Sequence, residues 1–139
     1  MNKTILEQFD SGLNELTDFY RANPFVDLKK IRPKLDGLCQ LVEADPVHRD
    51  DYLTRFLRVV DGMKTARARS NITRNAHLLD FCMRRLKWPE IGQALKAGYA
   101  SVVDADARLE TEALIKRIYD PAWEGGEFEF LAPDENIWE

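Results

Sequence analysis

The chain has few of the residues that bind metals or form covalent crosslinks, with two cysteines and two histidines among 139 residues. Cys39 and Cys82 both lie in apolar helical patterns, where cysteine usually behaves as a small hydrophobic residue. We therefore expect two buried free thiols, and a disulfide between them is an alternative that nothing else in the sequence favours. Without closely spaced cysteines or histidines there is no ligand set for structural zinc, so the sequence predicts neither a metal nor a cofactor.

Long apolar runs are also missing. The uninterrupted apolar stretches are only a few residues long, far below the roughly 20 residues that a membrane-spanning helix needs. An acidic residue, Glu7, interrupts the beginning of the chain before the apolar core of a signal peptide can form. We therefore expect a cytoplasmic protein that does not bind membranes.

Motifs of common enzyme classes are absent as well. The seven glycines are dispersed, and the pair Gly125-Gly126 precedes an acidic segment, whereas a phosphate-binding loop leads into a helix. His48 is followed by Asp50 and Asp51, a grouping that could transfer protons. Acidic residues are, however, favoured in the first turn of any helix by its dipole. The sequence therefore predicts that the protein is not an enzyme.

Two further patterns are similar to known motifs but depart from them. The spacing between Arg74 and His77 differs from the arginine–histidine spacing of helical ribonuclease toxins, so no such activity is inferred. Residues 89–99 resemble the first helix and turn of a helix-turn-helix. The segment that would read DNA contains Asp104 and Asp106, which would be repelled by phosphate. This charge argues against DNA reading by that element.

Helical periodicity dominates the chain instead. Apolar residues recur every three or four positions, and short turn signals separate the stretches. The predicted fold is all-α, a compact single-domain bundle of about five to six helices with an irregular acidic C-terminal extension. We place the helical bundle domain at residues 1–120 and the acidic aromatic extension at residues 121–139.

Several residues predict where helices begin and end. Thr4 and Glu7 fit a capping box at the start of the first helix. Asp45 with the proline after it, and later Ser70, are typical of helix N-caps. Pro33 lies inside a helical stripe, so we expect either a kink there or a new helix that begins at this proline.

Charge is unevenly distributed along the sequence. Residues 1–48 carry a net charge of -2, residues 49–90 a net +5, and residues 91–139 a net -7, when Lys and Arg are counted against Asp and Glu. Arginine clusters bind phosphates or carboxylates through paired hydrogen bonds. The alternative is that these arginines are solvated or pair with the acidic C-terminal third of the same chain. The candidate nucleic-acid-binding residues are Arg55, Arg58, Arg67, Arg69, Arg74, Arg84 and Arg85.

The end of the chain combines acids with aromatic rings. Residues 120–139 contain seven Asp or Glu, no Lys or Arg, and four large aromatic side chains. Such a composition suits binding to a basic partner, or covering a basic groove that nucleic acid would otherwise occupy. Alternatively, the first three of these aromatics complete the core of the bundle. The candidate protein-binding residues are Trp123, Glu127, Phe128, Glu129, Phe130 and Trp138.

Two functions follow as hypotheses. The first is a non-enzymatic protein–protein interaction module, such as an inhibitor, immunity factor, adaptor or small subunit, that uses the acidic aromatic segment to bind another protein with a basic surface. The second is a helical protein that contacts nucleic acid through the arginine-rich region. The net charge of -4 favours the first, whereas the local positive charge of residues 49–90 supports the second.

Overall fold

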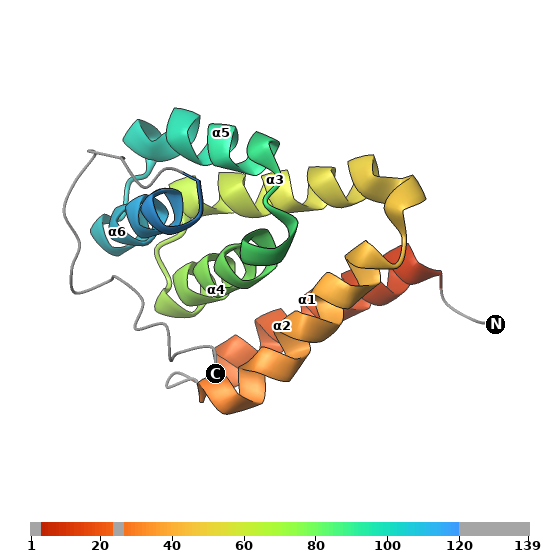
Figure 1. Ribbon diagram of the computed structural model, residues 1–139. Coiled ribbons are helices and arrows are strands. Elements are labelled where there is room, and N and C mark those ends of the chain that lie inside the picture. Colours follow the sequence, from red (N-terminus) through yellow and green to blue (C-terminus); the bar gives the residue numbers. More distant parts are fainter. Residues whose placement is uncertain (1–3, 24–26, 120–139) are drawn as a thin grey trace.

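The computed structural model describes residues 4–23 and 27–119, and these form an all-α bundle (Figure 1). This described part contains six α-helices and no strand, which confirms the predicted fold class. The elements are α1 (Ile5–Ala22), α2 (Leu28–Glu43), the 3-10 turn η1 (Pro46–His48), α3 (Arg49–Thr65), α4 (Arg69–Leu86), α5 (Pro89–Gly98), the 3-10 turn η2 (Tyr99–Ser101), α6 (Ala105–Leu114) and the π-helical turn η3 (Ile115–Tyr119). The predicted extension at residues 121–139 lies outside the described residues.

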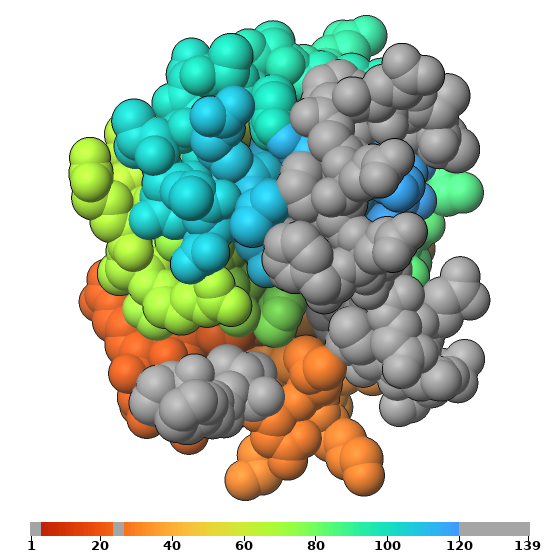
Figure 2. Space-filling model, turned by 90° about the vertical axis from the view of Figure 1, so that its left-hand side faces the viewer, coloured from red at the N-terminus to blue at the C-terminus, as the bar shows by residue number. Residues whose placement is uncertain are grey.

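Helix α4 is the central element of the bundle. It packs against α1, α2, α3 and α6, and it also contacts η3. Helices α1 and α2 form an antiparallel hairpin along one side of α4, while α5 packs against α3 and η3 (Figure 1). Figure 2 shows the surfaces of α5 and α6 towards one end of the molecule and the red and orange surfaces of α1 and α2 towards the other. Helix α4 therefore contacts elements from both ends of the bundle.

Most of the apolar residues meet in one large core, and a second, smaller cluster contains Met63, Ile72, Ala76, Val102 and Ala107. Phe9 of α1 contacts the rings of Tyr52 and Phe56 edge to face, with centroids 5.2 and 5.8 Å apart. Phe56 in turn contacts Trp88, at 5.7 Å, which joins α3 to the start of α5. Burial of such large rings is a major source of stability in a domain of this size. None of the described helices is both long and apolar enough to cross a lipid bilayer.

The predicted start of the first helix is confirmed by a hydrogen bond, and the end of α4 is marked by a change of backbone conformation. The Thr4 hydroxyl oxygen accepts a hydrogen bond from the Glu7 amide at 3.1 Å, and α1 begins at the next residue, Ile5. Helix α4 ends where Lys87 adopts a left-handed conformation, with φ of 50°, and donates its amide to the carbonyl of Met83. This reversal of the backbone lets α5 begin immediately afterwards at Pro89.

The prediction that Asp45 caps the third helix is wrong. Its carboxylate makes no cap; it accepts a hydrogen bond from the Tyr52 hydroxyl at 2.8 Å and lies 2.9 Å from His48 Nδ1. A buried tyrosine hydroxyl is costly without an acceptor, and Asp45 satisfies that requirement. The chain consequently forms a 3-10 turn from Pro46, and α3 begins only at Arg49.

The Ser70 cap is also wrong, and one of the two alternatives at Pro33 is excluded. Helix α4 already begins at Arg69, so Ser70 is inside the helix and Ala68 occupies the cap position without a side-chain hydrogen bond. Helix α2 runs without interruption through Pro33, which excludes a helix that begins there. The proline ring is exposed to solvent; it removes one amide donor from the helix and crowds the carbonyl of Lys29, four residues earlier.

The two cysteines are free and buried, as predicted, and they meet at the interface between α2 and α4. Cys39 and Cys82 each have no exposed surface. Their thiols are hydrogen-bonded to one another, and this contact together with burial raises the pKa of the Cys82 thiol. Sequence spacing alone did not predict the contact, because it depends on how α2 docks against α4.

We expect both thiols to resist chemical labelling in the native protein. Their burial limits reaction with a disulfide reagent such as dithionitrobenzoate to molecules that have opened, so native labelling should be about 100-fold slower than labelling in guanidinium. The absorbance of the released thiolate measures both rates. Prompt reaction of one thiol in native buffer would show that the α2–α4 interface is open there.

Candidate functional site

Several of the predicted nucleic-acid-binding arginines are held by acidic residues of the same chain. Arg55 of α3 binds Asp10 of α1 through two hydrogen bonds, from Nε at 2.6 Å and from the second guanidinium nitrogen at 2.9 Å. This contact lowers the pKa of the Asp10 carboxyl group. Arg69, at the start of α4, lies 3.4 Å from Asp106 of α6. These arginines therefore connect helices, which reduces the positive charge they offer to a ligand.

Arg84 and Arg85, near the end of α4, also have acidic partners. The Arg84 Nε atom donates to Asp80 at 2.8 Å, one turn earlier in the same helix. Arg85 donates a hydrogen bond from one guanidinium nitrogen to Asp36 and from another to Glu43, both on α2. Arg85 thus joins α4 to α2, and its position is fixed by two carboxylates.

The remaining three predicted arginines are spread over different parts of the molecule. Arg58 on α3 and Arg67 between α3 and α4 are exposed, and neither forms an ion pair with any residue the structure describes. Arg74 is largely buried near Tyr20, and burial lowers the pKa of its guanidinium group. The predicted set therefore does not gather on a single basic face.

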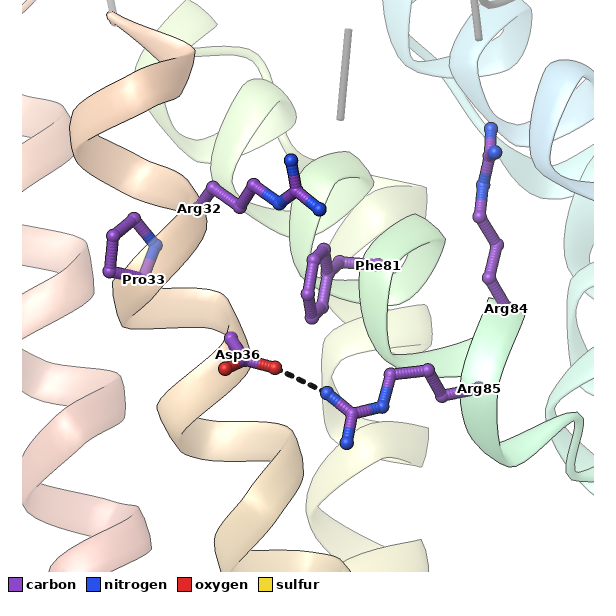
Figure 3. Close-up of a pocket in the computed structure, with 6 residues that line it drawn as sticks. All are labelled: Arg32, Pro33, Asp36, Phe81, Arg84 and Arg85. Carbon is purple, nitrogen blue, oxygen red and sulfur yellow. Dashed lines mark hydrogen bonds and ion pairs between the residues drawn. The ribbon is translucent and has the colours of Figure 1, made fainter. Parts of the chain in front are cut away.

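A groove between α2 and α4 brings two of the predicted arginines together with residues that the sequence did not single out. The groove has a volume of about 540 Å³. Arg84 and Arg85 line it on one side, and Arg32 lines it from α2 (Figure 3). The complete lining is Arg32, Pro33 and Asp36 from α2 with Phe81, Arg84 and Arg85 from α4.

The three groove arginines differ in how strongly they are held. Arg84 is bound to Asp80, whose residue surface is only 4% exposed and which also lies 3.3 Å from Arg117 of η3. Arg85 is bound to Asp36 at the groove. Arg32 is exposed and makes no ion pair with a residue in the described part of the chain. Arg32 can therefore receive a new carboxylate without losing an existing ionic partner there.

An aromatic ring lies among these charges. Figure 3 shows the half-buried Phe81 side chain extending from α4 towards α2, with Arg32 on one side of it and Arg85 on the other. Guanidinium groups bind carboxylates and also stack on aromatic rings. The arrangement suits a ligand that presents a carboxylate together with an apolar or aromatic group.

Sequence reasoning missed Arg32 and Phe81 for different reasons. Arg32 belongs to the first third of the chain, which carries a net negative charge, and Phe81 fits the apolar pattern of a helix. A signal for Arg32 was available, because Asp36 follows it at the four-residue spacing that places both on one face of a helix. No pattern in the sequence predicts that this face of α2 lies next to Phe81.

The second histidine is part of the interior. His77 of α4 is largely buried, and its Nδ1 atom lies 2.7 Å from the Tyr20 hydroxyl of α1. Burial lowers the pKa of His77 to about 4, so the ring is neutral at neutral pH. The hydrogen bond joins α1 to α4 and satisfies two polar groups in the core.

The six predicted protein-binding residues lie outside the described residues. They are Trp123, Glu127, Phe128, Glu129, Phe130 and Trp138. No protein family, curated protein or solved structure that was compared with the chain matches it.

Proposed function

We propose that the protein is a non-enzymatic protein-binding module whose α2–α4 groove accepts an acidic segment that also carries an aromatic side chain. The observation that carries this proposal is one groove lined by Arg32, Arg84, Arg85 and Phe81, in which Arg32 and Arg85 lie on either side of the ring. Arginine binds carboxylates by charge-assisted, paired hydrogen bonds, and an aromatic ring adds apolar contact area for little conformational entropy. The partner in this proposal is a protein with an exposed acidic and aromatic segment.

The charges favour a peptide over nucleic acid as the ligand. Asp36 lies inside the groove and would repel a continuous row of phosphates. Arg55 and Arg69, which the sequence offered as part of one basic face, are paired with acids elsewhere in the bundle. A short segment with separated carboxylates can avoid Asp36 and still reach Arg32.

We further propose that the protein acts in the cytoplasm. Cys39 and Cys82 are in contact and yet unpaired by a disulfide. Thiols in this arrangement suit a reducing compartment, where free cysteines persist.

Fluorescence anisotropy with a labelled short peptide of alternating glutamate and phenylalanine tests the proposal. We expect the full chain to bind it, and Arg32→Glu to weaken binding about tenfold or more, because a carboxylate contact is replaced by repulsion. The matched control is Arg67→Glu, which makes the same charge change at an exposed position outside the groove and should alter affinity less than about twofold. A glutamate–glycine peptide should bind several-fold more weakly, since it lacks the rings.

Two results would contradict the proposal. One is an equal loss of affinity in Arg32→Glu and Arg67→Glu, which would indicate attraction by overall charge alone. The other is stronger binding of a single-stranded oligonucleotide than of the peptide, with Arg58 and Arg67 required for it. The second result would assign the arginines to nucleic acid.

A further inference from the structure

We infer that the α2–α4 groove is the docking site of the chain's own acidic aromatic segment, residues 120–139, so that this segment and an outside partner compete for it. The inference rests on the proposed function, because it names an occupant for the same groove. Residues 120–139 lie outside the described residues, so the argument comes from the groove, from the place where the described chain ends and from the composition of the segment.

The last described turn is linked to the groove wall through one buried carboxylate. Its last element, η3, ends at Tyr119, and Arg117 of that turn lies 3.3 Å from Asp80. Asp80 is also the partner of Arg84, a residue of the groove lining. One carboxylate therefore contacts both the turn from which residues 120–139 continue and the wall of the groove.

The composition of the segment complements the groove. Residues 120–139 have seven acidic side chains, no basic ones and four large aromatic rings. The groove is lined by three arginines and Phe81, and Arg32 and Arg85 lie on either side of the ring. A chain of this length spans up to roughly 65 Å when extended, so its length does not limit access to the groove.

Attachment in the same chain makes this contact effective even when the intrinsic affinity is low. A tethered segment has an effective concentration on the order of 1 mM. If the same segment as a separate peptide binds with a Kd on the order of 100 µM, the attached copy reduces the apparent affinity for an added peptide about tenfold. Only a partner that binds the groove more strongly, or at high concentration, would then displace it.

The test compares the natural full chain with a full-length variant in which Trp123, Phe128, Phe130 and Trp138 are replaced by alanine. A fluorescent peptide with the natural sequence of residues 120–139 is titrated into each, and anisotropy gives the affinity. We expect the alanine variant to bind the peptide about tenfold more tightly than the natural chain. Adding Arg32→Glu to the variant should remove most of that gain, whereas adding Arg67→Glu should not.

The possible failures are distinguishable. Equal affinity of the peptide for both chains, with sensitivity to Arg32→Glu, would overturn the inference and leave the proposed function intact. Absence of binding to either chain would overturn both. If the alanine substitutions unfold the protein by circular dichroism, the aromatic rings belong to the core and the inference is wrong. A second variant, Glu127→Gln with Glu129→Gln, weakens the segment by charge alone and should raise peptide affinity in the same direction.

Discussion

Replacing Asp80 with asparagine is expected to lower the free energy of unfolding by about 3–5 kcal/mol. The carboxylate is almost fully buried and is bound to both Arg84 and Arg117. Arg117 is itself largely buried, and burial lowers the pKa of its guanidinium group. In the Asp80 variant the Arg117 charge would remain in the interior with no carboxylate bound to it. Removing one partner of a buried ion pair lowers stability by more than the intact pair contributes.

Urea denaturation followed by circular dichroism measures this loss. The matched control is Asp61→Asn, because Asp61 also pairs with a basic residue, Lys64 at 3.2 Å, but is 72% exposed. We expect the control to change the free energy of unfolding by less than about 0.5 kcal/mol. Similar losses in the two variants would mean that the Asp80 cluster is no more important than a surface ion pair.

Stability is expected to fall on mild acidification because His77 is neutral in the folded protein. Burial is the largest cause of its low pKa of about 4, compared with 6.5 for an unperturbed histidine; Arg117 and Arg69 lower it further, and Asp80 opposes them. Between these two pH values the unfolded chain binds a proton that the folded chain does not bind. The contribution of neutral His77 to the unfolding free energy is complete above pH 6.5. It is lost as the pH falls towards 4, by about 3 kcal/mol in total.

Comparison with His77→Gln isolates this effect from the carboxylates. Glutamine can still contact the Tyr20 hydroxyl, and it does not titrate. When the pH is lowered from 7 to 5, the natural protein should therefore lose about 2 kcal/mol more unfolding free energy than the variant. A difference that is the same at both pH values would show that His77 takes up its proton equally in the folded and unfolded states.

Much of the helical framework follows from local sequence signals. The Thr4 cap, the proline that opens α5 and the apolar stripes of α1 and α4 all depend on residues within a few positions of one another. Asp45 shows where this reasoning fails, because its carboxylate is taken by the buried Tyr52 hydroxyl of the next helix. A local rule for caps does not include that competing contact.

The candidate site depended on contacts between distant parts of the chain. Arginine enrichment pointed to Arg84 and Arg85, but the groove also needs Arg32 from a segment whose net charge is negative. The same enrichment gave Arg55 equal weight, although Arg55 is bound to Asp10 of α1 and does not line the groove. The docking of α1 and α2 onto the rest of the bundle decides which arginines can receive a ligand. Charge counts along a sequence do not predict that docking.

The most direct measurement of the central claim is a titration of the nitrogen-15-labelled full chain with the glutamate–phenylalanine peptide, observed at the arginine Nε–Hε resonances. If the α2–α4 groove binds acidic aromatic segments, the largest shifts will be those of Arg32, Arg84 and Arg85, while Arg58 and Arg67 stay nearly unchanged. Larger shifts at Arg58 and Arg67, or no shift at Arg32 at saturating peptide, would contradict the account.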